Sequence, residues 1–129
     1  MSRKKKKLRV LAIDSGPADG AFLELLFKHA GYVARRELIG AWGLECFERW
    51  HPDIVLLEIW LPDVDPLDLL RKFKTIDRRS QVIILSSSGA SRASDAMEAG
   101  AFAFIEKPFD AELLLAAVDK AIKERASAC

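Results

Sequence analysis

Short, continuous apolar runs alternate along the chain with longer stretches in which apolar residues recur every three to four positions. Continuous runs of this length are typical of strands that are buried on both faces of a sheet. They predict five strands, over residues 8–13, 32–37, 54–59, 82–85 and 102–105. The third strand is unusual, because a carboxylate, Glu58, interrupts its apolar sequence just before the end.

The intervening stretches predict five helices. The first begins at Pro17, and its apolar face is expected to consist of Phe22, Leu23, Leu26, Phe27 and Ala30. A second helix is expected over residues 42–50, a third after an Asp65 cap, and a fourth that ends at Ala99. The last helix begins after an Asp110 cap. Its apolar positions follow helical spacing without a miss: Leu114, Ala117, Val118, Ala121 and Ile122.

Strands that alternate with helices indicate a parallel sheet covered on both faces, which is a three-layer α/β fold. In such folds the working site lies beyond the carboxyl ends of the strands. The polar residues at these ends are Asp14, Ser15, Glu58, Ser86 and Lys107. We therefore expect these five side chains to meet in one site.

The composition is that of a single globular domain, since half of the 129 residues are apolar and 30% are charged. We expect the folded domain over residues 8–125, between a basic disordered tail over residues 1–7 and a short tail over residues 126–129. The apolar runs are too short to cross a membrane, and no secretory signal precedes them. Cys46 and Cys129 suggest neither a disulfide framework nor a metal site, which favours a cytoplasmic location.

The formal net charge of +1 hides an uneven distribution. Residues 1–9 hold six basic groups and no acid, and the other 14 basic residues face 19 acidic ones, so the remainder carries −5. The basic run could contact nucleic acid or an anionic lipid surface, although a solvated tail is the simpler interpretation. The acidic remainder argues against a nucleic-acid surface on the domain itself.

Four stretches resemble the receiver domains of two-component response regulators, the CheY-like family. They are VLAIDSG, PDIVLLEIWLPDVD, VIILSSSG and AGAFAFIEKPFD, in this order along the chain. The resemblance covers residues 8–125. It implies a (βα)5 flavodoxin-like fold, with a doubly wound parallel sheet of five strands in the order 2-1-3-4-5.

The resemblance also implies roles for particular side chains. In that family an aspartate at the end of the third strand accepts a phosphoryl group. Mg²⁺ is held by two acids after the first strand, by the acceptor, and by a main-chain carbonyl two positions beyond it. Glu58 stands at the acceptor position, Asp14 and Ser15 at the acidic positions, and Trp60 at the carbonyl position. The resemblance thus implies either no cofactor or a weak Mg²⁺ site at Asp14, Glu58 and Trp60.

The phosphate-binding side of the site is implied to consist of Ser86, at the hydroxyl switch position, and Lys107, followed by Pro108. Phe104 occupies the position of the aromatic switch residue. Because this ring carries no hydroxyl group, we expect it to sit inward.

Two departures from the family pattern alter the reactive centre. Ser15 removes one anionic metal ligand. Glu58 carries one more methylene than aspartate, which displaces its carboxylate from the in-line position, and a misplacement of about 1 Å can cost about a hundredfold in rate. Its carboxylate should instead reach Lys107 directly. We therefore expect no certain catalytic residue, no enzyme activity, and little or no phosphorylation.

Several of these residues also have a purely structural interpretation. Asp14 could cap the first helix, Ser86 could be an ordinary turn hydroxyl, and Lys107 could be a surface lysine. A strand carboxylate such as Glu58 is harder to explain in this way, because charged groups are seldom buried unless they are paired.

Three functions remain open. The first is a receiver module that signals by protein–protein contact through residues 92–99, 102–105 and 110–124, with a sensor kinase or an output domain as partner. The same surface could form a homodimer, and any contact with nucleic acid would come from an output domain absent from this chain. The second is a weakly phosphorylatable, Mg²⁺-dependent receiver. The third is a small flavodoxin-like cofactor binder, which the lack of a Gly-rich phosphate loop after the first strand disfavours.

Overall fold

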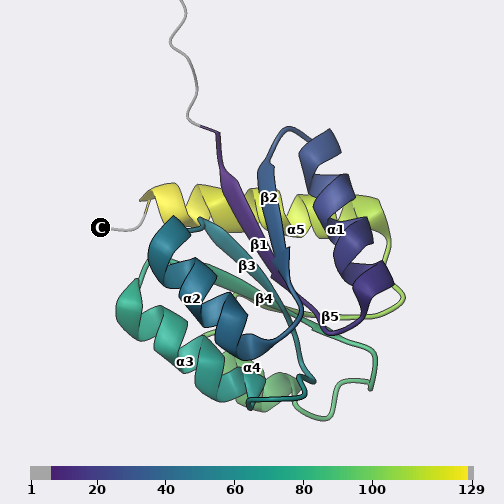
Figure 1. The fold of residues 1–129 in the computed structure, drawn as a ribbon, viewed down its shortest axis with the longest axis vertical. Helices are drawn as coiled ribbons and strands as arrows, with labels where there is room; N and C mark the ends of the chain where they lie inside the picture. Colours follow the sequence, from purple (N-terminus) through teal and green to yellow (C-terminus); the bar gives the residue numbers. More distant parts are fainter. Residues whose placement is uncertain (1–6, 128–129) are drawn as a thin grey trace, which may run out of the picture.

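The computed structural model describes residues 7–127, which form a sheet of five strands with helices on both faces (Figure 1). All neighbouring strands are parallel, and their order is β2-β1-β3-β4-β5. The strands are β1 (Arg9–Ile13), β2 (Val33–Glu37), β3 (Ile54–Glu58), β4 (Gln81–Ser86) and β5 (Ala103–Glu106). The predicted fold class and strand order are confirmed, and each strand bound lies within one residue of its prediction.

The helices are α1 (Pro17–His29), α2 (Gly40–Trp50), α3 (Pro66–Ile76), α4 (Ala93–Glu98) and α5 (Ala111–Ser127). Both predicted aspartate caps are confirmed. Asp65 accepts a hydrogen bond from the backbone N–H of Leu67 at 2.9 Å, and Asp110 accepts one from Glu112 at 2.8 Å. Helix α5 continues two residues past the expected domain boundary at 125. The two expected tails fall largely outside the described residues.

Two apolar layers hold the sheet between the helices. The layer beneath α2, α3 and α4 includes Phe47, Phe73 and Ala96, and the layer beneath α1 and α5 includes Leu23, Phe27, Leu114, Val118 and Ala121. The two layers receive alternate residues of each strand, as expected for strands covered on both faces. The predicted inner face of α5 is confirmed, since Leu114, Val118 and Ala121 are fully buried.

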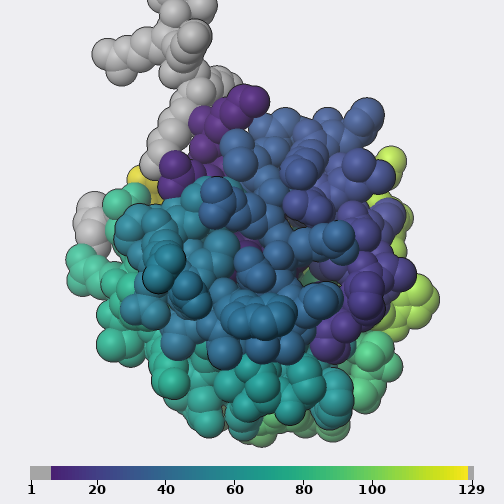
Figure 2. All heavy atoms as spheres, in the orientation of Figure 1, coloured from purple at the N-terminus to yellow at the C-terminus, as the bar shows by residue number. Residues whose placement is uncertain are grey.

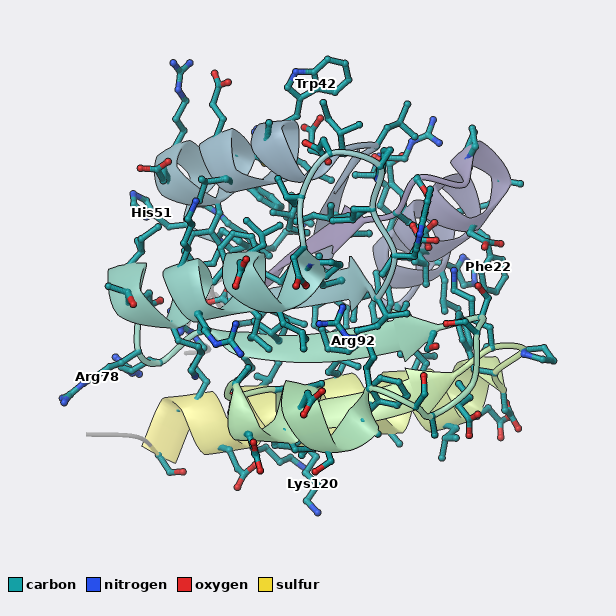
Figure 3. All side chains as sticks on the ribbon, turned by 90° about the horizontal axis from the view of Figure 1, so that it is seen from below. Phe22, Trp42, His51, Arg78, Arg92 and Lys120 are labelled. Atoms are coloured by element: carbon teal, nitrogen blue, oxygen red, sulfur yellow. The ribbon has the colours of Figure 1, made fainter. Side chains whose placement is uncertain are left out.

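Two predicted residues of the apolar face of α1 are wrong, because Phe22 and Ala30 are exposed. Leu23 and Phe27 are buried against the sheet, but Phe22 is 49% exposed and lies on the outer side of the molecule (Figure 3). Neighbouring positions on a helix differ by about 100° in direction, so a helix that turns Leu23 inward turns Phe22 aside. An exposed phenylalanine is thus left on α1.

The topology brings the carboxyl ends of the central strands to one edge. Strand β1 pairs with β2 on one side and with β3 on the other. The order of the strands therefore reverses between β1 and β3, and ligand sites of such sheets lie at this switch point. Asp14 follows β1 directly, and Glu58 and Ser86 end β3 and β4. Among residues 7–127, no helix is long and apolar enough to cross a membrane.

Candidate functional site

Asp14 anchors one end of the site. Its side chain is 2% exposed, and its two oxygens accept from different donors: Oδ1 from the Gly16 backbone N–H at 2.9 Å, and Oδ2 from Lys107 Nζ at 2.8 Å. The bond to Gly16 comes before α1 begins, and the Gly16 cap position itself has no side-chain bond. Asp14 therefore shapes the turn into α1, but its charge is matched by a lysine from the other end of the chain.

Glu58 is bound by Ser15 and not by a cation. One carboxylate oxygen, Oε2, accepts from both the backbone N–H of Ser15 at 2.7 Å and its hydroxyl at 2.8 Å. Burial raises the pKa of Glu58 above its ordinary value, against the effect of the two Ser15 hydrogen bonds, and the nearby Asp14 charge adds to the rise. The carboxylate of β3 is thus fastened to the loop between β1 and α1.

Lys107 lies between two carboxylates. Its ammonium group donates to Asp14 at 2.8 Å and to Asp19 at 3.0 Å. Burial opposes the lysine charge, but the hydrogen bonds and the Coulombic attraction of Asp14 and Asp19 outweigh it and raise the pKa of Lys107. The ammonium group therefore stays charged and paired with both carboxylates.

The expected ion pair between Glu58 and Lys107 is wrong. The extra methylene of Glu58 brings its carboxylate within reach of the two Ser15 donors, and Lys107 finds its second partner in Asp19. Asp19 lies in the first turn of α1, five residues after Asp14. Asp19 is not among the site residues predicted from the sequence. An acid in the first turn of the helix that follows Asp14 could have been recognised as a second partner for Lys107.

Ser86 is fully buried at the end of β4, but its hydroxyl turns back to its own loop. It donates to the Gly89 carbonyl at 2.8 Å and accepts from the Ser88 backbone N–H at 3.2 Å. In addition, the backbone N–H of Lys107 donates to the Ser86 carbonyl at 2.6 Å. The backbones of Ser86 and Lys107 are thus hydrogen-bonded to each other, while the Ser86 side chain stabilises the turn over residues 86–89.

The remaining predicted residues surround this centre. Phe104 is partly buried and packs against the layer beneath α2, α3 and α4, so the ring sits inward as expected. The Lys107–Pro108 peptide bond is cis. Trp60, two residues beyond Glu58, exposes 64% of its surface at the rim. The structure therefore gathers Asp14, Ser15, Glu58 and Lys107 into direct contact and leaves Trp60 outside that network.

The loop after β3 is tied to the start of α2. Asp63 accepts from the backbone N–H groups of Gly40 and Ala41, each at 2.9 Å. These hydrogen bonds lower the pKa of Asp63, although desolvation acts in the opposite direction. A side chain at Gly40 would collide with Val64, so glycine is needed for this approach. Asp63 supplies the cap that α2 lacks from its own sequence.

Comparison with known proteins identifies the family behind this arrangement. Residues 10–119 match the response regulator receiver domain family. The chain belongs to this family. The receiver domain is 33% identical over 120 residues to the chemotaxis protein CheY of Bacillus subtilis (strain 168), which covers 88% of this chain and 97% of the relative.

Two further relatives agree with the assignment. The sporulation initiation phosphotransferase F of Bacillus subtilis (strain 168) is 29% identical over 113 residues, or 87% of this chain and 91% of that protein. The crystal structure of a response regulator receiver domain protein from Clostridium thermocellum matches with a TM-score of 0.86 at 29% identity, over 92% of this chain and 97% of that chain. The receiver domain is thus a module of two-component signalling.

Receiver domains typically bind Mg²⁺, but the donors of this site do not fit the ion. Both oxygens of Asp14 are engaged, one by a backbone N–H and one by the ammonium group of Lys107, and an oxygen of Glu58 is engaged twice by Ser15. Over residues 7–127, no group of three or more acidic, histidine or cysteine side chains is placed to hold a metal. Mg²⁺ is usually held by one or two carboxylates together with water, and here Lys107 and the two Ser15 donors compete with the ion for Asp14 Oδ2 and Glu58 Oε2.

Proposed function

We propose that this receiver domain is an atypical response-regulator module that signals by protein–protein contact, without phosphorylation at Glu58. Glu58 takes the position of the acceptor aspartate. The single observation that carries the proposal is the double hydrogen bond from Ser15 to Glu58 Oε2. The carboxylate charge is shared by both oxygens, so two short hydrogen bonds to Oε2 weaken the whole group as a nucleophile and hold it turned toward Ser15.

The hydrogen bonds of Lys107 and Ser86 support the same proposal. In a phosphorylated receiver, the lysine would have to meet the phosphoryl oxygens. Here Lys107 is already paired with Asp14 and Asp19, and Ser86 is bonded to Gly89. Phosphorylation of Glu58 would require Lys107 and Ser86 to exchange these partners for phosphoryl oxygens, and the buried Asp14 would then lose its cation.

The proposed partner is a sensor kinase or an output domain, bound at the surface formed by α4, β5 and α5. Met97 on α4 is 47% exposed and Leu113 on α5 is more exposed still, so apolar contacts are available there. Phe104 of β5 packs inward beneath this surface. In this proposal the partner reads a fixed conformation, and contact with nucleic acid occurs only through an output domain.

The proposal has no catalytic role for any residue of the site. The alternative is a slow, Mg²⁺-dependent phospho-acceptor, for which the proximity of Asp14, Glu58 and Lys107 is the supporting observation.

Incubation with acetyl phosphate and Mg²⁺, followed by intact-protein mass spectrometry, separates the two. We expect no phosphoryl adduct on the unmodified protein. The control is the double variant Ser15→Asp, Glu58→Asp, which restores both acids and should gain one phosphoryl group. A hydroxylamine-sensitive adduct mapped to Glu58 in the unmodified protein would favour the slow phospho-acceptor. If the double variant also stays unlabelled, the substitutions at Ser15 and Glu58 are not what prevents phosphorylation, and the proposed reason is wrong.

A further inference from the structure

Helix α1 carries an apolar stripe that the fold does not use. Ala18, Phe22, Leu25 and His29 succeed one another at spacings of four, three and four residues. Phe22 is 49% exposed and Leu25 is 70% exposed, whereas the core-facing positions of the same helix, Leu23 and Phe27, are buried. The stripe is therefore separate from the core-facing side of α1. Helix α1 lies at the surface of the molecule (Figure 2), and Phe22 points outward from it (Figure 3).

The stripe has the shape of a helix-packing seam. Phe22, Leu25, Leu26 and His29 line a shallow hollow of about 320 Å³, and all four belong to α1. The ring of Phe109, from the loop before α5, lies 6.4 Å from the ring of Phe22, which lines the hollow. Alternating spacings of four and three residues place side chains in one line along a helix, which is the pattern by which two helices interlock.

The two ends of the stripe carry opposite charges. At the amino-terminal end are Asp19 and, next to Phe109 in the sequence, Asp110 and Glu112. Asp19 shares Lys107 with Asp14, and this end stays negative after the charge of Lys107 is counted. At the carboxyl-terminal end are Lys28 and His29.

The basic end keeps its sign after its own ion pairs are counted. Glu24 pairs with both Lys28 and Arg36, each at 3.2 Å, so this trio carries one net positive charge. Burial and the nearby negative charge of Asp119 raise the pKa of Tyr32, which follows α1. The charge of Asp119 is itself balanced by an ion pair with Lys123, at 3.0 Å between Nζ and Oδ2.

We propose that the protein forms a weak symmetric dimer in which α1 packs antiparallel against α1 of a second copy. A two-fold axis between Phe22 and Leu25 places the phenylalanine of each copy on the leucine of the other. The same axis brings the acidic end of each stripe to the basic end of the other and opposes the two helix dipoles. A parallel arrangement would bring like charges together.

This dimer leaves the surface of α4, β5 and α5 free for a partner. The seam has only four positions on each copy, so it belongs to the class of small interfaces, and we expect a dissociation constant of about 10⁻⁴ M. The dimer does not depend on the chemistry at Glu58, so its test is independent of the proposed lack of phosphorylation.

Sedimentation velocity over a concentration range from about 10 μM to about 1 mM tests self-association. We expect a concentration-dependent shift from monomer to dimer. Leu25→Asp should remove the shift, because it places a charge at the centre of the seam; a matched control, Met97→Asp on α4, should leave it intact. Thermal melts of both variants should match the unmodified protein, because both positions are exposed. Monomer at every concentration, or loss of the dimer in Met97→Asp but not in Leu25→Asp, would overturn the proposal.

A charge exchange tests the antiparallel orientation. Lys28→Glu and Glu112→Lys should each weaken the dimer about tenfold at low salt, since each puts like charges face to face. The double variant exchanges the two charges and should recover most of the lost affinity. A double variant that dimerises no better than either single variant would overturn the antiparallel arrangement.

Discussion

Ser15 donates two hydrogen bonds to the same oxygen of Glu58, one from its backbone at 2.7 Å and one from its hydroxyl at 2.8 Å. In our proposal the serine stands at the position of a second acid of the family, and the glutamate stands at the position of the acceptor aspartate. The two departures therefore compensate each other, because the longer carboxylate reaches the donor that the shorter residue provides. A single change at either position would lose this match.

Replacement of Ser15 by alanine should destabilise the protein by about 1–2 kcal/mol, because Glu58 loses the hydroxyl donor and keeps only the backbone N–H. Urea denaturation at neutral pH measures the change. Ser94→Ala is the matched control, since Ser94 is exposed on α4, and we expect it to change the free energy of unfolding by less than about 0.5 kcal/mol. Equal effects of the two substitutions would contradict a role for the Ser15 hydroxyl.

The pairing of Lys107 predicts a graded response to mutation. Lys107→Met leaves the buried Asp14 without its cation and should cost about 3 kcal/mol. Asp19→Asn removes only the outer partner, which is 59% exposed, and should cost less than about 1 kcal/mol. Chemical denaturation of the two variants compares these values. A larger loss in Asp19→Asn than in Lys107→Met would show that the order of importance is reversed.

Glu58 should make stability depend on pH in a defined direction. Burial raises its pKa above the ordinary 4.5, so the folded protein holds this proton more tightly than the unfolded chain does. The contribution of Glu58 to stability is therefore full below pH 4.5 and is lost as pH rises through the folded-state pKa. Glu58→Gln removes the titration and keeps an acceptor for Ser15.

The free energy of unfolding of Glu58→Gln minus that of the unmodified protein should thus be larger at about pH 7.5 than at about pH 4.5. Urea titrations of both proteins at the two pH values give the comparison. A relative stability that stays constant, or that moves in favour of the unmodified protein at the higher pH, would be inconsistent with a raised pKa.

Millimolar Mg²⁺ should barely change the melting temperature of the unmodified protein, because the site oxygens are held by hydrogen bonds and by Lys107. Ser15→Asp should melt lower without metal, since a third carboxylate then adjoins Asp14 and Glu58. Added Mg²⁺ should raise its melting temperature by relieving this repulsion. A clear Mg²⁺-dependent rise in the unmodified protein would mean that Ser15 does not disable the metal site.

Most of the fold could be predicted from sequence because the strands are continuous apolar runs and the caps Asp65 and Asp110 use a local signal. The failures arise where direction in space matters. Phe22 belongs to the apolar pattern of α1, yet the sheet accepts only one side of the helix, on which Leu23 and Phe27 lie. Sequence spacing alone does not fix that rotation.

The site could be predicted as a set of positions but not as a set of contacts. The strand ends bring Asp14, Glu58 and Lys107 together, as expected from a parallel sheet. Which groups then pair depends on side-chain length over distances of a few ångströms. The extra methylene of Glu58 favours Ser15, and the first turn of α1 presents Asp19 to Lys107.

The central claim is that the site is already closed by its own side chains. The most direct test is the amide spectrum of the ¹⁵N-labelled protein before and after addition of Mg²⁺ with beryllofluoride, a mimic of a carboxylate-bound phosphoryl group. We predict that the amide resonances of Ser15, Ser86 and Lys107 do not move, whereas those of the Ser15→Asp, Glu58→Asp double variant do. Saturable shifts of these three amides in the unmodified protein would contradict the claim.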